Sequence, residues 1–389
     1  MKKICIVTTM WSSIRNWIEP IIPEYNKRGI DVTVVCNMDN EFESYLNTKY
    51  PYLHTCSFPF PRGANVFGSI KSIFFLKKFF RSQKFDLVQY STPNASFYAS
   101  VASKAAKIQK RLYCQWGMVF ISQKGIKRLF YKLIEKKICK ESTIIQPDSF
   151  GNLEYCRKHH FYSAENSHVI WNGSAKGLDL TKYDLTKKQE YCAEIKNRYD
   201  IPTDSMIVGF VGRLGKEKGC NELFSAFKKL KNDFPTLKLL FVGPIEKEKT
   251  IDKHLLNYFK TCPDIIATNR VSDVEKHISA MDIFVLPSYR EGFGMSVIEA
   301  SAMEVPVICT KYPGPSSAIM DGKTGLLIEP KNENELYSAI KKLILNNELR
   351  KELGKNGRVF VETHFEQKQF IKELMNDRMS ILGQDFLTK

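Results

Sequence analysis

Two carboxylates, Glu291 and Glu299, stand eight positions apart in the segment PSYREGFGMSVIEASA. Between them, Gly292 and Gly294 precede a helix that we expect to open near Ser296. Glycines before a helix N-terminus let backbone N–H groups approach a phosphate, and the helix dipole favours its negative charge. Carboxylates that accept from pairs of hydroxyls suit sugar and ribose rings. The pattern indicates an anion site with two acids beside it, although the same acids could instead only cap the helix start.

A second cluster, VGFVGRLGKEKG, carries Gly212, Arg213 and Lys218 between an expected strand and an expected helix. An Arg fork and a Lys point charge at such a corner can neutralise a diphosphate as it leaves a sugar. No Ser or Thr follows the lysines, so the segment is not a Walker loop. The alternative is that these cations are loop residues without a ligand.

Short β-branched runs alternate with helical patterns along the whole chain, which predicts α/β layers around parallel sheets. A lapse into Asn, Gly, Ser and Asp at residues 172–184 predicts an interdomain linker. We therefore expect two doubly wound Rossmann-like domains that face a cleft, covering residues 1–175 and 176–365, and a C-terminal helix over 366–389 that returns toward the first domain. Ligands in such sheets bind beyond the carboxyl ends of the strands.

The predicted strands and helices fall into two sets. The strands of the first half are expected at 3–8, 32–35, 87–90, 111–115, 143–146 and 168–170, and its helices at 14–27, 67–81, 95–107, 125–140 and 151–158. The strands of the second half are expected at 206–211, 238–242, 265–267, 283–286, 307–310 and 325–328, and its helices at 221–232, 273–280, 296–303, 333–345 and 367–382.

Composition excludes several classes of protein. The 389 residues are 43% hydrophobic and 26% charged, which is ordinary for a folded chain. Ten scattered cysteines without a C-x-x-C pair, and a start without a signal peptide, predict a reducing cytoplasm and no structural zinc. No apolar run reaches the length of a bilayer span.

Positive charge is concentrated in the first half of the chain. Residues 1–175 hold 25 Lys and Arg against 12 Asp and Glu, and so carry +13 of the net charge of +16. Such a field attracts nucleic acid, an anionic membrane or a phosphorylated substrate. The chain has neither a helix-turn-helix nor an RNP-like run, so nucleic acid is not an expected partner.

The motifs NGSAKGLDL, FVGRLGKEKG, PSYREGFGMSVIEASAMEVPVI and DGKTGLLIEP identify a family resemblance. From residue 172 to residue 330 the chain resembles the family 4 retaining glycosyltransferases of the GT-B fold. Within that family it is most similar to the bacterial capsule and O-antigen branch, which acts on lipid-linked saccharides. The resemblance is diffuse over the first 170 residues.

Site roles follow from the resemblance by motif position. It implies that Arg213 and Lys218 bind the donor diphosphate, that Glu291 faces the donor sugar, and that Glu299 holds the ribose. A UDP-sugar is the expected donor and a polyprenyl-diphosphate saccharide the expected acceptor. No metal or other cofactor is expected, since no D-x-D triplet occurs and Arg213 and Lys218 can replace the cation. The remaining donor-binding candidates are Gly212, Gly292, Phe293 and Gly294, with Ser12 and Ser13 after the first strand.

The chain departs from the family pattern at three places. Residues 10–13 replace a glycine-rich turn, and Glu304 stands where relatives usually have Gly. Trp116, with Gln115 beside it, stands where many relatives have the His of a His-Gly pair. Gln115 and Trp116 remain candidate sugar contacts, but neither carries the positive charge of a protonated His. The other functions compatible with the fold are a non-catalytic scaffold and a sugar-nucleotide epimerase.

Two helices of the basic half mix lysines with apolar residues. In residues 125–140 and 66–81 we expect the apolar faces to pack on the sheet while the lysines face solvent. Those lysines could rest on anionic lipid, which predicts a cytoplasmic protein attached peripherally to the inner face of the cytoplasmic membrane.

Overall fold

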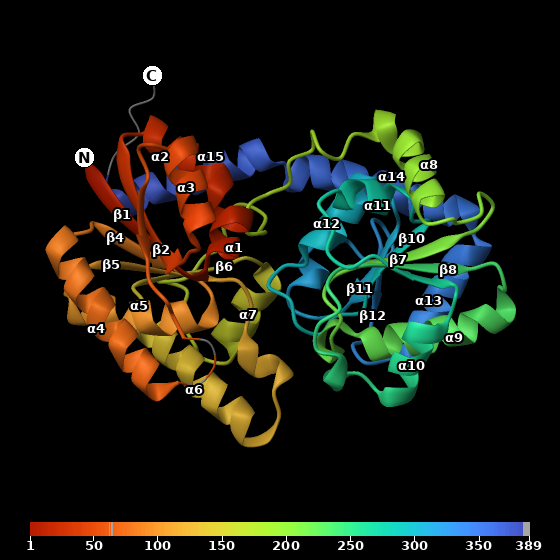
Figure 1. Cartoon of the computed structure of the whole chain (residues 1–389), viewed down its shortest axis with the longest axis horizontal. Coiled ribbons are helices and arrows are strands. Elements are labelled where there is room, and N and C mark those ends of the chain that lie inside the picture. Colours follow the sequence, from red (N-terminus) through yellow and green to blue (C-terminus); the bar gives the residue numbers. More distant parts are fainter. Residues whose placement is uncertain (62, 64, 384–389) are drawn as a thin grey trace. The chain divides into compact units, whose positions relative to one another are not determined.

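The computed structural model of this chain describes residues 1–61, 63 and 65–383. They form two compact units: unit 1 comprises residues 1–177 together with the segment from Lys368 onward, and unit 2 comprises Leu178–Gln367. The two points along the chain where one unit ends and the other begins therefore lie within two residues of the predicted domain boundaries. Figure 1 shows both units with their elements labelled.

Each unit is built on a six-stranded parallel sheet, and the two sheets share one topology. The strand order is β3-β2-β1-β4-β5-β6 in unit 1 and β12-β11-β10-β7-β8-β9 in unit 2. In both sheets the first strand of the unit pairs with its second and its fourth, which places a topological switch point beside it. The prediction of two doubly wound Rossmann-like domains is confirmed.

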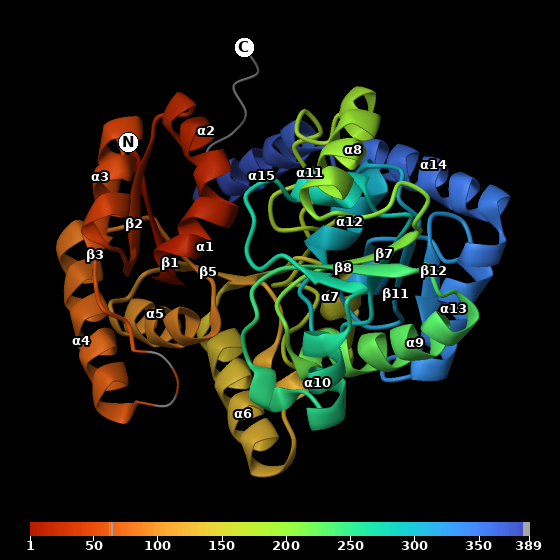
Figure 2. The same cartoon turned by 45° about the vertical axis from the view of Figure 1, so that its right-hand side comes forward.

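Unit 1 has helices on both faces of its sheet (Figure 2). Alternate residues of its first strand enter different cores: Cys5 and Val7 enter one, and Ile4 and Ile6 enter the other. Its strands are β1 Lys2–Met10, β2 Ile30–Asn37, β3 His54–Ser57, β4 Leu87–Tyr90, β5 Lys110–Gln115 and β6 Ile144–Pro147. Its helices are α1 Trp11–Ser13, α2 Ile22–Lys27, α3 Asn40–Lys49, α4 Val66–Gln83, α5 Pro93–Ala105, α6 Gly125–Glu141, α7 Phe150–Lys158 and α15 Gln367–Leu382.

Unit 2 has the same layered plan around one continuous hydrophobic core. Helices α9, α10 and α13 cover one face of its sheet, and α8, α11, α12 and α14 cover the other (Figure 1). Its strands are β7 Ile207–Val211, β8 Lys238–Val242, β9 Ile265–Ala267, β10 Ile283–Leu286, β11 Val307–Thr310 and β12 Leu326–Ile328. Its helices are α8 Lys188–Arg198, α9 Cys220–Asp233, α10 Lys253–Thr261, α11 Val274–Ser279, α12 Met295–Ala302, α13 Glu333–Leu345 and α14 Asn347–His364.

The C-terminal helix α15 returns to unit 1, as predicted, and is fixed there by a buried arginine. Arg378 is 1% exposed, and its guanidinium donates to Gln89 of β4 at 3.1 Å and to Gln146 of β6 at 2.8 Å. The same group pairs with Asp377 at 2.5 Å, and Asp377 lies 2.5 Å from His168. A buried charge with this many partners joins the end of the chain to the middle of the sheet.

Some local predictions were wrong. The strand expected at 168–170 does not form: the chain makes a single bridge from Ser167 to Ile145 of β6 and then turns away toward Gly173, whose φ is 95°. The helix expected at 14–27 is instead a series of short helical turns. Elements α3, β3, α8 and α10 were not predicted. The polar sequences of α3, β3 and α8 carry little hydrophobic periodicity, whereas α10 is amphipathic and was missed although its sequence carries the signal.

Among the helices of the described residues, none is long and apolar enough to cross a membrane.

Candidate functional site

The candidate donor site lies in unit 2, at the switch point between β7 and β10. Arg213 and Lys218 follow β7, and Glu291 follows β10, which pairs directly with β7. Parallel neighbours end at the same edge of a sheet, so residues 73 positions apart meet. The Lys218 Nζ donates to Glu291 Oε1 at 2.5 Å, and the two side chains are only 18% and 15% exposed. The structure thus joins two residues that the sequence pattern had assigned separately.

Two loops are bonded to each other behind this pair. The backbone carbonyl of Glu217 accepts from the Ser288 hydroxyl at 3.1 Å and from the Tyr289 N–H at 3.1 Å. Gly219, whose φ is 73°, lies so close to Pro287 that a Cβ there would stand 2.1 Å from the Pro287 carbonyl oxygen. Only glycine permits this contact, and it holds Lys218 against the loop that carries Glu291.

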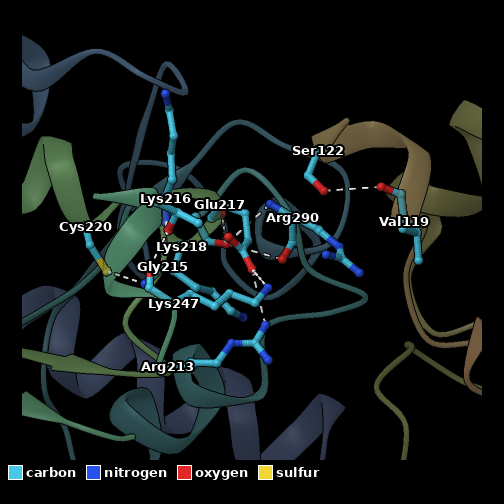
Figure 3. Close-up of polar contacts among 12 residues, drawn as sticks. Val119, Ser122, Arg213, Gly215, Lys216, Glu217, Lys218, Cys220, Lys247 and Arg290 are labelled. Carbon is cyan, nitrogen blue, oxygen red and sulfur yellow. Dashed lines mark hydrogen bonds and ion pairs between the residues drawn. The ribbon is translucent and has the colours of Figure 1, made fainter. Parts of the chain in front are cut away.

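Arg213 is positioned by Glu217, a residue to which sequence reasoning had given no role. Glu217 Oε1 accepts from Arg213 at 3.3 Å and from Lys247 Nζ at 2.6 Å (Figure 3). Burial favours a higher pKa for Glu217, but the hydrogen bond from Lys247, a backbone hydrogen bond and the charges of Lys247 and Arg213 together outweigh burial, and the pKa lies below its ordinary value. An ionised Glu217 therefore holds two cations, and the Arg213 Nε has no partner among the described residues. Lys247 follows β8, and its place at the same sheet edge was the signal that could have revealed it.

The glycine-containing loop leads directly into α12. Gly294, with φ of 96°, is the residue before the helix, which begins at Met295, one position earlier than expected. The side chain of Phe293 is 2% exposed and its ring lies 5.1 Å from that of Phe365. Phe293 can therefore offer a donor only its backbone, as the resemblance had implied.

Glu299 lies on α12 and interacts with a buried tyrosine. The Tyr183 side chain hydrogen-bonds to Glu299, and burial together with this negative neighbour raises the pKa of Tyr183 well above its usual range. Tyr183 thus remains a neutral hydroxyl at every physiological pH. It orients Glu299 at the helix that opens the site.

Glu304, the second residue after α12, shows why the relatives usually have glycine at this position. Glu304 has φ of 51°, a left-handed conformation that glycine adopts without strain. Its carbonyl accepts from Lys188 Nζ at 3.3 Å, and Gly354 of α14 packs against the same carbonyl. The requirement at this position is one of backbone geometry within unit 2.

In unit 1 the equivalent switch point lies between β1 and β4. Ser12 and Ser13 are half-buried and form the first helical turn directly after β1. The Thr9 N–H donates to Thr92 Oγ1 at 3.0 Å, which joins the end of β1 to the loop after β4. This turn therefore presents backbone N–H groups without glycine.

Of the two candidate sugar contacts, only Trp116 has an accessible side chain. Gln115 is fully buried: its Nε2 donates to Glu135 at 2.6 Å and its Oε1 accepts from Tyr162 at 3.1 Å. Gln115 therefore belongs to the interior of unit 1, and the prediction that its side chain contacts a sugar was wrong. Trp116 is half-buried and its ring lies 5.8 Å from that of Trp17.

The partner of Gln115 makes the stability of unit 1 depend on pH. Burial raises the pKa of Glu135 to about 7, against hydrogen bonds from Gln115 and Tyr113 that favour the charged form. Between its ordinary pKa and about 7 the folded state binds the extra proton, so stability falls as pH rises through this window.

We expect Glu135→Gln to remove that slope. Relative to wild type, the variant should gain about 2–3 kcal/mol of unfolding free energy between pH 5 and pH 8. Urea denaturation at the two pH values measures the effect. Glu154→Gln, at an exposed position of α7, is the control and should leave the slope unchanged. Parallel pH curves for Glu135→Gln and wild type would contradict the assignment.

Comparison with known proteins agrees with this geometry. The family described as "Glycosyl transferases group 1" matches residues 193–360, and "Glycosyl transferase 4-like" matches residues 3–149. The capsular polysaccharide biosynthesis glycosyltransferase CapM of Staphylococcus aureus is 30% identical over 356 residues, which are 90% of this chain and 89% of that protein. Putative glycosyltransferase EpsD of Bacillus subtilis is 24% identical over 99% of this chain and 98% of its own length.

Solved structures share the fold. Anabaena Alr3699/HepE, crystallised with UDP and glucose, superimposes with a TM-score of 0.78 at 17% identity, covering 98% of this chain and 100% of that one. A glycosyltransferase of Rickettsia africae superimposes with a TM-score of 0.77 at 20% identity over 99% of both chains. With the two Rossmann-like units and the paired Lys218 and Glu291, these matches establish that the chain belongs to the family 4 glycosyltransferases of the GT-B fold, with relatives in capsule and polysaccharide biosynthesis.

Proposed function

We propose that this glycosyltransferase moves a hexose or N-acetylhexosamine from a UDP-sugar to a polyprenyl-diphosphate-linked saccharide, with retention of anomeric configuration and without a metal ion. The observation that carries the proposal is the contact between Lys218 and Glu291 at the unit 2 switch point. A cation for the diphosphate and a carboxylate for the sugar hydroxyls are held there side by side. The capsular name of the S. aureus relative and the UDP complexes of HepE support the choice of substrates.

Each charged residue has a distinct task in the proposed reaction. Arg213 and Lys218 bind the diphosphate and stabilise it as negative charge develops on the leaving oxygen. The backbone of residues 292–294 and the start of α12 add N–H donors. Glu291 orients the sugar, and Glu299 accepts from the ribose hydroxyls. Because Glu217 holds Arg213 in place, the cation is positioned before the donor binds.

In the chemical step the acceptor hydroxyl attacks the sugar C1 on the face from which the nucleotide departs. The bond from C1 to the diphosphate oxygen breaks, the bond from C1 to the acceptor oxygen forms, and a donor phosphate oxygen takes the acceptor proton. Glu291 forms no covalent bond to the sugar. A glycosyl adduct on Glu291 in a mass spectrum of the enzyme with donor would overturn this step.

The function is tested by nucleotide release from a panel of UDP-, GDP- and ADP-sugars, with and without a lipid extract that contains polyprenyl-diphosphate saccharides. N-acetylgalactosamine, N-acetylglucosamine and 6-deoxy amino sugars are the first UDP donors to try. We expect UDP release that requires the lipid, persists in EDTA, and disappears in Glu291→Ala.

The other outcomes separate the alternatives. Release that stops in EDTA and returns with Mg²⁺ would overturn metal independence alone. Release without lipid, with interconversion of the sugar, would favour an epimerase. If no donor binds or reacts, the chain is a scaffold that keeps the family fold. We further propose that the enzyme works at the inner face of the cytoplasmic membrane, where such an acceptor is accessible.

A further inference from the structure

The exposed apolar side chains of this protein gather on two helices of unit 1. Eight of the fourteen large hydrophobic residues that are exposed in the described chain belong to α4 and α6. We call these eight the α4–α6 patch, and their exposed fractions range from 47% for Phe130 to 88% for Ile126. The patch consists of Val66, Phe67, Ile70 and Phe74 of α4, and Ile126, Leu129, Phe130 and Leu133 of α6.

The exposure of these eight side chains shows that the expectation that the apolar faces of both helices pack on the sheet was wrong. The buried residues of α6 are in its second half, from Glu135 onward, and those of α4 begin at Ser72. Each helix is therefore anchored by its C-terminal part and presents the apolar residues of its N-terminal part. Contiguous apolar surface on a folded domain marks a binding surface.

The two parts of the patch border one groove. Helix α5 packs against both α4 and α6 and lies between them, as Figures 1 and 2 show. The groove has a volume of about 340 Å³, and its apolar lining includes Ile70 and Ile73 of α4, Phe97 and Tyr98 of α5, and Phe130 and Ile134 of α6. A groove of this lining suits a hydrocarbon chain.

The two helices that carry the patch also carry basic residues, and acidic residues are missing from the patch. Helix α4 carries no Asp or Glu, and the two glutamates of α6, Glu135 and Glu141, are both buried. Lys127 and Arg128 are exposed beside Ile126 and Leu129, and neither has an ion-pair partner within the described residues. The exposed side chains of α4 and α6 thus combine apolar and cationic residues and include no carboxylate.

This composition decides which partner fits. Helices that lie in a membrane interface combine Leu and Phe with Lys and Arg, and both α4 and α6 have this composition. We propose that the α4–α6 patch inserts into the acyl region of an anionic bilayer, with one lipid hydrocarbon chain in the groove. The inference deepens the membrane location given under the proposed function, but it rests on residues outside the donor site.

Flotation with vesicles tests the insertion. Wild-type protein should bind phosphatidylglycerol-containing vesicles and bind pure phosphatidylcholine poorly. Replacing Phe67, Phe74, Ile126 and Leu129 together by Ser should weaken binding at least 30-fold, since each replacement removes an apolar side chain that the bilayer would bury. Lys127→Gln with Arg128→Gln should weaken it about fivefold per residue at low salt. The matched control is Leu345→Ser with Val359→Ser, which removes two equally exposed apolar side chains of unit 2 and should change nothing.

The groove needs its own probe. In Ile70→Trp we expect a blue-shifted emission component that vesicles with brominated acyl chains quench, and in Val359→Trp we expect none. Undiminished flotation of the quadruple Ser variant would overturn the proposal, as would wild-type protein that binds no vesicle while the patch mediates self-association.

Binding of UDP, measured on the same proteins, separates the two proposals. A protein that floats but binds no nucleotide would leave the membrane inference standing and refute the proposed function. A protein that binds UDP but does not float would leave the proposed function standing and refute the membrane inference.

Discussion

Lys218→Met is expected to lower kcat/KM for the nucleotide sugar about 10³-fold, the largest effect of any single change at the donor site. Among the described residues, the Lys218 ammonium is the only cation paired with Glu291, and methionine keeps most of the side-chain length while removing the charge. Loss of an interaction that strengthens as the leaving group gains charge should appear mainly in kcat. Steady-state nucleotide release measures it.

The neighbouring lysine provides the control. Lys216 lies in the same 3-10 turn, but its side chain is exposed and points away from Glu217 in Figure 3. Lys216→Met should change kcat/KM less than about threefold. Equal losses in the two variants would mean that general positive charge, rather than the Lys218–Glu291 contact, drives the reaction.

A double-mutant cycle makes the test sharper. Glu291→Gln alone should also be severe, because it leaves Lys218 without its carboxylate and replaces the ionised acceptor of the sugar hydroxyls by a neutral amide. If the two residues act as a unit, the double variant should be little worse than the worse single variant. Independent, multiplying losses would contradict the paired role.

Arg378→Met is expected to have the largest effect on stability, with a loss of about 3–5 kcal/mol in unit 1. The change leaves the side-chain oxygens of Gln89 and Gln146 without their charged donor and Asp377 without its arginine in a buried site. Hydrogen exchange should show faster opening in unit 1 and in α15, while the amides of the unit 2 sheet keep their protection.

Lys372→Met is the control on the same helix, since Lys372 is exposed. It should cost less than about 0.5 kcal/mol. Should Arg378→Met match this control, α15 would be held by its apolar contacts alone, chiefly those of Phe370, Leu374 and Met375 in the unit 1 core.

The contacts of Asp377 with His168 and Arg378 predict that low pH weakens the attachment of α15 to unit 1. Burial opposes ionisation of Asp377, but His168 and Arg378 outweigh it and hold the pKa of Asp377 below its ordinary value. A lowered pKa in the folded state adds stability above the ordinary pKa of an aspartate and loses it as pH falls through the lowered value. Acid should therefore release α15 from unit 1.

The amino-acid sequence by itself determined the elements and their class. The strands of unit 2 were predicted to within one residue because each is a short apolar run between turn residues, a local signal that needs no partner. The motifs around Gly212 and Gly292 also indicated an anion site, since glycine lets the backbone approach a phosphate closely.

Tertiary structure decided which of these residues meet and which faces remain exposed. Lys218 and Glu291 lie 73 positions apart, and only the pairing of β7 with β10 makes them neighbours. Gln115 looked available in the sequence, but Glu135 of α6 buries and binds it. The apolar face of α6 has the periodicity of a core helix, and its exposure follows from where the helix is anchored. Periodicity shows that a face is apolar, whereas only the packing of the other elements shows whether anything covers it.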